Sequence, residues 1–161
     1  AENALLDLAE KDLSFDINFF MTGAQEAFTM IVEAFARGDR DTLRDLLSDD
    51  VYKAFDSSIK EREERGEIME TRIHGIRKSQ IIEASLEDDK MAFITLRFEA
   101  EETSVIKDSE GNILEGDPDK ATQMIDIWTF GRDISSDDPR WLLYQTRSDD
   151  PDDNETLPNT D

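Results

Sequence analysis

Apolar residues in the first half of the chain recur at helical spacing. Between residues 24 and 36 they fall three and four positions apart, which places them on one face of a helix. Gly38 ends this helix, because glycine readily adopts the left-handed conformation found just after a helix. Asp39 is placed to cap a short second helix, and a third helix ends near Gly66. The pattern predicts three consecutive helices from about Phe15 to Gly66.

After Gly66 the apolar spacing changes from helical to alternating. The predicted strands are residues 82–86, 92–100, 123–130 and 141–146. The polar pair Asp88–Asp89 separates the first two strands and indicates a hairpin, while a loop rich in Gly, Asp and Pro precedes the third. Helices followed by antiparallel strands predict an α+β fold, in which the helices cover one face of a curved four-stranded antiparallel sheet between Glu67 and Thr146.

Both ends of the chain follow neither period. Residues 1–23 combine apolar side chains with five acids and one lysine, so we expect an N-terminal extension or interaction arm there. We also expect self-association into a homo-oligomer through the apolar end of this arm, at residues 19–21. The last residues are rich in aspartate, and we expect a disordered acidic tail over 148–161. The predicted folded domain is 24–147.

Composition and charge narrow the class of partner. Of the 161 residues, 37% are hydrophobic and 36% charged, against roughly 45–50% and 25% in average domains, so the surface is densely charged. The net charge of −22 opposes binding to phosphate backbones, and we expect no nucleic-acid partner. The chain has no cysteine and a single histidine, which excludes disulfides, thiolate ligands and two-histidine metal sites. We expect neither a metal nor a cofactor.

Several motifs occur in an order that is typical of one known family. In the first half they are 31–47 (IVEAFARGDRDTLRDLL), 50–55 (DVYKAF) and 61–66 (EREERG). In the second half they are 94–98 (ITLRF), 115–117 (EGD), 127–133 (IWTFGRD) and 137–142 (DDPRWL). From Phe28 to Arg147 the chain resembles the C-terminal domain of the forty-four-kilodalton scaffold subunit of the mitochondrial inner-membrane protein translocase, together with its bacterial relatives.

The resemblance implies a cone-like fold related to nuclear transport factor two, with an apolar pocket between the helices and the sheet. The aromatic residues are first of all core residues, and a subset of the apolar positions is expected to line this pocket and to hold lipid or a hydrophobic peptide. The expected pocket-lining residues are Phe28, Ile31, Phe35, Phe55 and Trp128. The resemblance brings no catalytic residues and implies a non-enzymatic scaffold in protein transport.

The expected partners are membrane-complex proteins or a translocating polypeptide, with lipid as a further ligand. The acidic N-terminal arm argues against contact of this arm with acidic lipid and suggests a bacterial relative. No stretch approaches the roughly 18 apolar residues of a membrane-spanning helix. We therefore expect a protein of the bacterial inner membrane that is peripheral or anchored by a segment upstream of this sequence.

One stretch of the chain is not acidic. Residues 51–78 contain seven basic and six acidic side chains, so a contact with acidic lipid or an acidic partner is expected here before anywhere else. The candidate contact residues are Lys53, Lys60, Arg62, Arg65, Arg77 and Lys78. The alternative is a solvated helix face with ion pairs one turn apart, such as Glu61 with Arg65.

The competing hypothesis is a small-molecule enzyme or carrier, because cone-like domains also include ketosteroid isomerases. It requires a buried acid as a base, and Asp56 and Asp126 are candidates because each lies beside apolar positions. His74 is a candidate proton carrier, but no nucleophile accompanies it in the sequence. We expect His74 to be structural or solvent-exposed.

Overall fold

The computed structural model describes residues 2–12, 15–149, 157–158 and 160. Its helices are α1 (Glu2–Lys11), α2 (Ile17–Arg37), α3 (Arg40–Leu46) and α4 (Asp49–Glu64). Its strands are β1 (Ile68–Glu87), β2 (Met91–Lys107), β3 (Ile113–Glu115), β4 (Thr122–Asp133) and β5 (Leu142–Ser148). Helices precede strands along the chain, which confirms the predicted α+β class.

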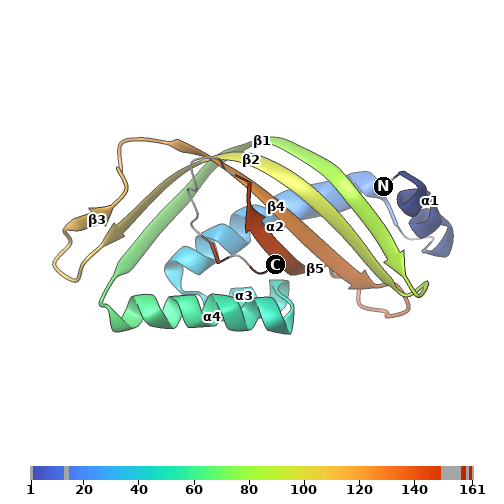
Figure 1. Ribbon diagram of the computed structural model, residues 1–161, viewed down its shortest axis with the longest axis horizontal. Coiled ribbons are helices and arrows are strands. Elements are labelled where there is room, and N and C mark those ends of the chain that lie inside the picture. The colour runs from blue at the N-terminus through green and yellow to red at the C-terminus, as the bar shows by residue number, and fades with distance from the viewer. Residues whose placement is uncertain (1, 13–14, 150–156, 159, 161) are drawn as a thin grey trace.

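The strands form one curved antiparallel sheet (Figure 1). Its order is β1-β2-β4-β5, and the short β3 pairs with the end of β2. The described sheet thus has five strands rather than the predicted four. The additional strand, β3, has only three residues and lies within the segment assigned to a loop, so no alternation was there to reveal it.

The hairpin of β1 and β2 is longer than its alternating pattern indicated. β1 has 20 residues, and its register against β2 shifts at three places along the strand. Each shift is a bulge or irregularity that interrupts the alternation of side chains between the two faces. Asp88 and Asp89 form the turn with φ of 55° and 52°, a left-handed conformation that aspartate tolerates better than most residues.

The helices lie on the concave side of the sheet (Figure 1). α2 runs beneath the arch of β1 and β2, α4 lies further from the sheet, and α1 lies beside the tip of the β1–β2 hairpin. Lys11 at the end of α1 forms an ion pair of 3.4 Å with Asp89 in the hairpin turn. The predicted N-terminal arm, residues 1–23, therefore contains α1 and the first turns of α2.

Capping residues set the helix ends. Asp16 begins α2, and its carboxylate accepts hydrogen bonds from the backbone N–H groups of Asn18 and Phe19. Gly38 ends α2 with φ of 71°, and the following N–H of Asp39 donates to the carbonyl of Ala34. The predicted stop at Gly38 is confirmed, and α3 begins two residues later.

The core lies between α2, α4 and the concave face of the sheet. Phe28 of α2 packs against Phe98 of β2 and Trp128 of β4, with ring centroids 4.6 and 4.7 Å away. Phe35 of α2 meets Phe55 of α4 edge-on at 5.2 Å. Each aromatic side chain removes a large apolar area from water, so these contacts hold the helices to the sheet and to one another.

The described residues near the C-terminus return to the sheet. Leu157 is buried and belongs to the core cluster. The N–H of Thr160 donates to the carbonyl of Thr146 in β5, and the Thr146 hydroxyl donates to the carbonyl of Pro158. The rest of the predicted disordered tail, residues 150–156, 159 and 161, lies outside the described residues.

Candidate functional site

An apolar groove opens where α2 begins and β4 ends. Its volume is about 350 Å³. Four aromatic side chains form much of its wall and come from segments far apart in the sequence: Phe15, Phe20, Phe130 and Trp141. The groove thus depends on the tertiary fold rather than on a local motif.

The aromatic rings of the groove are packed edge to face. The Phe20 ring lies 4.9 Å from the Trp141 ring and 6.2 Å from the Phe130 ring, both at steep angles. Phe15 contacts Trp141 at 6.2 Å. Phe19, next in the chain, leaves 81% of its surface exposed at the groove. Phe19 extends the apolar surface formed by the other rings of the groove, and a contiguous apolar surface of this kind is typical of an interaction site.

Charged residues form the rim of the groove. Arg132 forms an ion pair with Asp12, and both side chains are only 10% exposed. Arg140 pairs with Asp138 at 2.8 Å, while Asp16 is engaged in capping α2. Both arginines of the rim already have carboxylate partners, so the rim presents no uncompensated positive charge.

The residues predicted to line a pocket are fully buried or nearly so. Phe28, Ile31, Phe55 and Trp128 have no measurable exposure or close to none, and they pack in the core. None of these four borders the apolar groove. Phe35 is 3% exposed and borders a second pocket, beneath the C-terminal end of α4. The sequence indicated the buried aromatic residues but not the groove, whose rings come from α2, from β4 and from the residues just before α2 and β5.

The candidate basic contact residues lie mostly on the surface of α4 and β1. Lys53, Lys60, Arg65, Arg77 and Lys78 are exposed. Lys60 pairs with Asp56 one turn away at 3.5 Å, Arg65 pairs with Glu67, and Arg77 pairs with Glu101. Neighbouring carboxylates therefore partly neutralise three of these five charges. This is the arrangement expected for a solvated face with ion pairs, the alternative to a contact with acidic lipid or an acidic partner.

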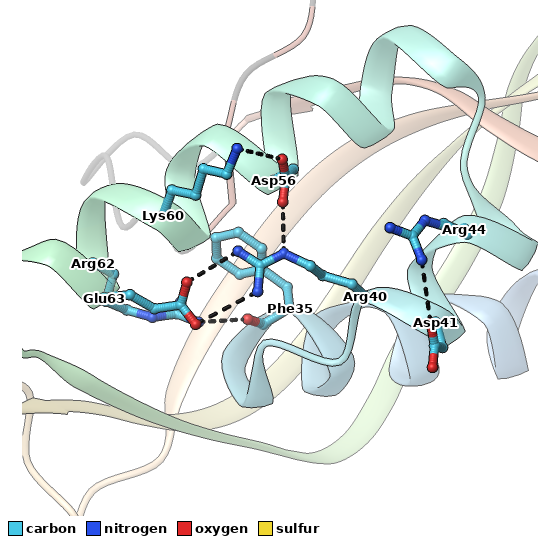
Figure 2. Close-up of polar contacts among 8 residues, drawn as sticks. All are labelled: Phe35, Arg40, Asp41, Arg44, Asp56, Lys60, Arg62 and Glu63. Carbon is cyan, nitrogen blue, oxygen red and sulfur yellow. Dashed lines mark hydrogen bonds and ion pairs between the residues drawn. The ribbon is translucent and has the colours of Figure 1, made fainter.

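Arg62 differs from the other basic candidates because its side chain is buried, at 7% exposure. Its guanidinium donates to the carbonyl oxygen of Phe35 at 2.9 Å (Figure 2). It also donates to the carbonyl oxygen of Ala36 at 3.1 Å. These carbonyls belong to the last turn of α2, where backbone acceptors lack partners within the helix. Arg62 therefore joins α4 to α2 and is turned away from the surface.

Asp56, a candidate catalytic base, is part of an ion-pair network (Figure 2). Arg40 of α3 donates to Asp56 at 2.6 Å and to Glu63 at 3.0 Å. The hydrogen bond from Arg40, together with the charge of Lys60, lowers the pKa of Asp56 below its usual range. Asp56 thus remains ionised. Its ion pair with Arg40 links α3 to α4, so its role here is structural.

The other two catalytic candidates lie apart from the apolar groove. His74 is exposed on β1, and its ring nitrogen Nε2 lies 2.5 Å from the hydroxyl of Thr103 on β2. Asp126 is buried on β4 at 8% exposure. Neither borders the groove, and within the described part of the chain no group of three or more potential metal-ligating residues is found.

Glu102 on β2 is a buried acid that sequence reasoning missed. It is 2% exposed, and its Oε2 atom has no hydrogen-bond partner among the described residues. Burial, with a smaller contribution from the charge of Asp126, raises the pKa of Glu102 to about 7. The signal was present in the sequence: the inward positions of β2 run through Phe98 and Ala100, and the next is Glu102.

Solved structures share the arrangement of helices and sheet. The intermembrane space region of the chloroplast protein ARC6 aligns with a TM-score of 0.56 at 14% identity, covering 83% of this chain and 96% of that one. A periplasmic fragment of TraM aligns with a TM-score of 0.55 at 15% identity, covering 83% and 97%. Identities this low show the fold alone. Helices packed on an open antiparallel sheet define the cone-like α+β class related to nuclear transport factor two.

The sequence places the chain more narrowly. The family model of the Tim44-like domain matches residues 1–148, so the chain belongs to the Tim44-like domain family. This confirms the resemblance that its motifs indicated.

Curated relatives are translocase subunits. The mitochondrial import inner membrane translocase subunit TIM44 of mouse is 27% identical over 142 residues, and its human counterpart is 25% identical; both alignments cover 86% of this chain. The probable subunit tin-44 of Caenorhabditis elegans is 24% identical over 145 residues. The chain spans about a third of the length of these relatives. Among the described residues, no helix is long and apolar enough to cross a membrane.

Proposed function

We propose that this domain is a non-enzymatic binding and scaffold module of a membrane-associated protein-transport complex. The family supports the proposal, because its curated relatives are named as subunits of an inner-membrane import translocase. The observation that carries it is the apolar groove, with Phe19 exposed beside a wall of packed aromatic rings. Its partners are membrane-complex proteins or a translocating polypeptide, and its place is the inner membrane of a bacterium.

The occupant of the groove is a hydrophobic peptide segment rather than an anionic lipid. The groove accepts apolar side chains, and its rim acids include Asp16 and Asp45 while both rim arginines are paired. The whole chain carries −22, so an acidic headgroup approaching the rim is repelled. A peptide with apolar residues flanked by lysine or arginine matches both the groove and its rim.

The observations favour binding over catalysis. An enzyme of this fold class requires an acid or histidine that converges with other polar groups on a substrate pocket. Asp56 is engaged with Arg40 and Lys60, and His74 lies on the exposed surface of β1. The groove offers rings and paired charges instead, which suits recognition of an apolar chain.

Trp141 supplies a direct test, because it lines the groove while the other tryptophan, Trp128, is fully buried. A leucine-rich peptide flanked by lysines is titrated while tryptophan emission is followed. Binding is expected to shift the emission of wild-type protein and to leave that of Trp141→Phe unchanged. The same peptide flanked by glutamates is expected to bind more weakly, because the rim is acidic.

A matched pair of variants on α2 locates the contact. Phe19→Ser is expected to weaken peptide binding, while Met30→Ser, an exposed apolar residue of the same helix outside the groove, is expected to leave it unchanged. Equal effects of the two substitutions would contradict the proposal. If the protein floats with phosphatidylglycerol vesicles and its tryptophan emission does not respond to the peptide, the groove binds lipid instead.

A further inference from the structure

A second pocket lies at the opposite end of the sheet from the apolar groove. It has a volume of about 350 Å³ and is bounded by the C-terminal end of α4, the start of β1, the end of β2 and the β3 segment. Phe35, Met69 and Ile106 give it apolar walls, and Glu102 lies in its lining. Nothing in the proposed peptide-binding function uses this pocket.

Close backbone packing shapes one wall of the second pocket. Gly116 follows β3 with φ of 86°, and a β-carbon there would lie 2.1 Å from the carbonyl oxygen of Ser104 on β2. Only glycine permits this approach, so the β3 segment is held directly against the end of β2. The pocket is therefore bounded by backbone contacts as well as by side chains.

Glu102 is the unusual group of the second pocket. Only 2% of its surface is exposed. Its Oε2 atom has no hydrogen-bond partner among the described residues. A buried carboxylate oxygen without a partner is costly, because it loses its hydration and gains no hydrogen bond in its place. Its pKa, raised to about 7 by burial and by the charge of Asp126, reflects this cost.

The two arginines of the second pocket are engaged with other groups. Arg62 donates to the carbonyls at the end of α2 and to the sulfur of Met69. Arg65 pairs with Glu67 at 3.1 Å. Glu115 and Asp117 add further acids to the lining, opposed by Lys120. The site therefore favours a positively charged ligand over an anionic one.

We propose that the second pocket binds an organic cation, with Glu102 receiving an alkylammonium or alkylguanidinium head and the apolar walls contacting its alkyl chain. The buried carboxylate gains the charge partner that the described residues do not provide, and the cation gains a site with little competing water. A free amine and the lysine or arginine side chain of a partner share this chemistry. The proposal does not depend on the peptide-binding function of the groove.

The test uses the whole chain and three probes: n-butylammonium, N-acetyl-lysine amide and uncharged n-butanol. Binding is followed by NMR through the methyl signals of Met69 and Ile106. n-Butylammonium is expected to give saturable shifts of these methyl signals, with or without N-acetyl-lysine amide doing the same. n-Butanol is expected to give none. Binding of N-acetyl-lysine amide assigns the site to a side chain of a partner, and its failure assigns it to a free amine.

A matched pair of substitutions on β2 separates the site from general attraction of cations to an acidic protein. Glu102→Gln is expected to weaken n-butylammonium binding by about tenfold or more, because the buried charge is removed with little change of shape. Glu101→Gln, whose side chain pairs with Arg77, is expected to leave binding unchanged. Equal effects of the two substitutions would overturn the proposal.

Two further results would also overturn it. If n-butanol binds wild-type protein as tightly as n-butylammonium, the pocket is merely apolar, and this comparison needs no variant. If Lys120→Gln strengthens the binding of n-butylammonium about tenfold or more, Lys120 is the partner of Glu102 in the free protein, and the unpartnered carboxylate oxygen on which the proposal rests does not exist in solution. A normal circular dichroism spectrum of each variant verifies that it is folded.

Discussion

The guanidinium of Arg62 donates to the carbonyl oxygen of Phe35 across 2.9 Å, so that the last turn of α4 caps the last turn of α2 (Figure 2). The cation meets the negative end of the α2 dipole and donates a second hydrogen bond, to the carbonyl of Ala36. The guanidinium also lies over the Phe35 ring, 5.2 Å from its centroid. One side chain thus fixes the relative position of two helices.

Arg62→Ala is therefore expected to destabilise the protein by about 2–4 kcal/mol, because the carbonyl of Ala36 loses the guanidinium as donor and that of Phe35 keeps only the N–H of Gly38. Urea unfolding measures the loss. Arg65→Ala, three residues further on, removes an exposed arginine paired with Glu67 and is expected to cost about 0–1 kcal/mol. Similar costs for the two substitutions would show that Arg62 does not act as a helix cap.

The stability contributed at Glu102 depends on pH. Its pKa is raised from the ordinary value of 4.5 to about 7 in the folded protein. Between these values the folded state retains a proton that the unfolded state releases, so stability falls as pH rises through this window and is lowest above it. The total loss is on the order of 3 kcal/mol.

Glu102→Gln lacks this titration. We expect the variant to gain stability relative to wild type as pH rises from about 4.5 to about 7, with no further change above that. Urea unfolding of both proteins across this range measures the difference in stability, and the titration of acids that do not interact with Glu102 cancels in this difference. A difference that does not vary with pH would contradict the raised pKa.

Gly131 on β4 lies between two aromatic rings. A β-carbon at this position would come within 2.8 Å of both Phe93 on β2 and Tyr144 on β5. Gly131→Ala is expected to cost about 1–3 kcal/mol, because the rings must separate to admit the methyl group. Gly75→Ala on β1, where nothing lies within 4 Å, is expected to be neutral or slightly stabilising. Thermal unfolding of the two variants compares the positions.

Phe19 and Phe20 are neighbours in sequence with opposite environments. Phe20→Ala is expected to cost about 3–5 kcal/mol, because the side chain packs against Phe130 and Trp141 and leaves a cavity when removed. Phe19→Ala is expected to change stability by no more than about 0.5 kcal/mol, because the ring is 81% exposed. Urea unfolding distinguishes the two, and a large cost at Phe19 would show that its ring is covered in solution.

Sequence patterns identified the fold because the core-facing side chains follow regular spacing. α2 and α4 were recognised from their apolar stripes, and β2 from alternation along most of its length. The alternating segment predicted at residues 82–86 covers only the end of β1, because the register shifts along this strand break the alternation that marks a strand.

The candidate sites were harder to predict than the fold. Hydrophobicity indicates that a side chain is buried, but it does not indicate whether empty space lies beside it. Phe28 and Trp128 pack tightly together in the core, while Phe20 and Trp141 meet across more than a hundred residues of sequence to form the groove. Glu102 was overlooked because a charged residue is seldom assigned to an inward position, even where the register of the strand requires one.

The outer strands of the sheet are protected against joining other sheets. On β1, the backbone N–H of Ile73 donates to the carboxylate of Glu33 on α2, next to one of the register shifts. On β5, Thr146 is hydrogen-bonded through both its N–H and its carbonyl to Thr160. An incoming chain finds these hydrogen-bonding groups occupied and the twist irregular, which hinders growth into fibrils. Under the proposed peptide-binding function, this protection keeps a bound extended polypeptide from adding to the sheet as a further strand.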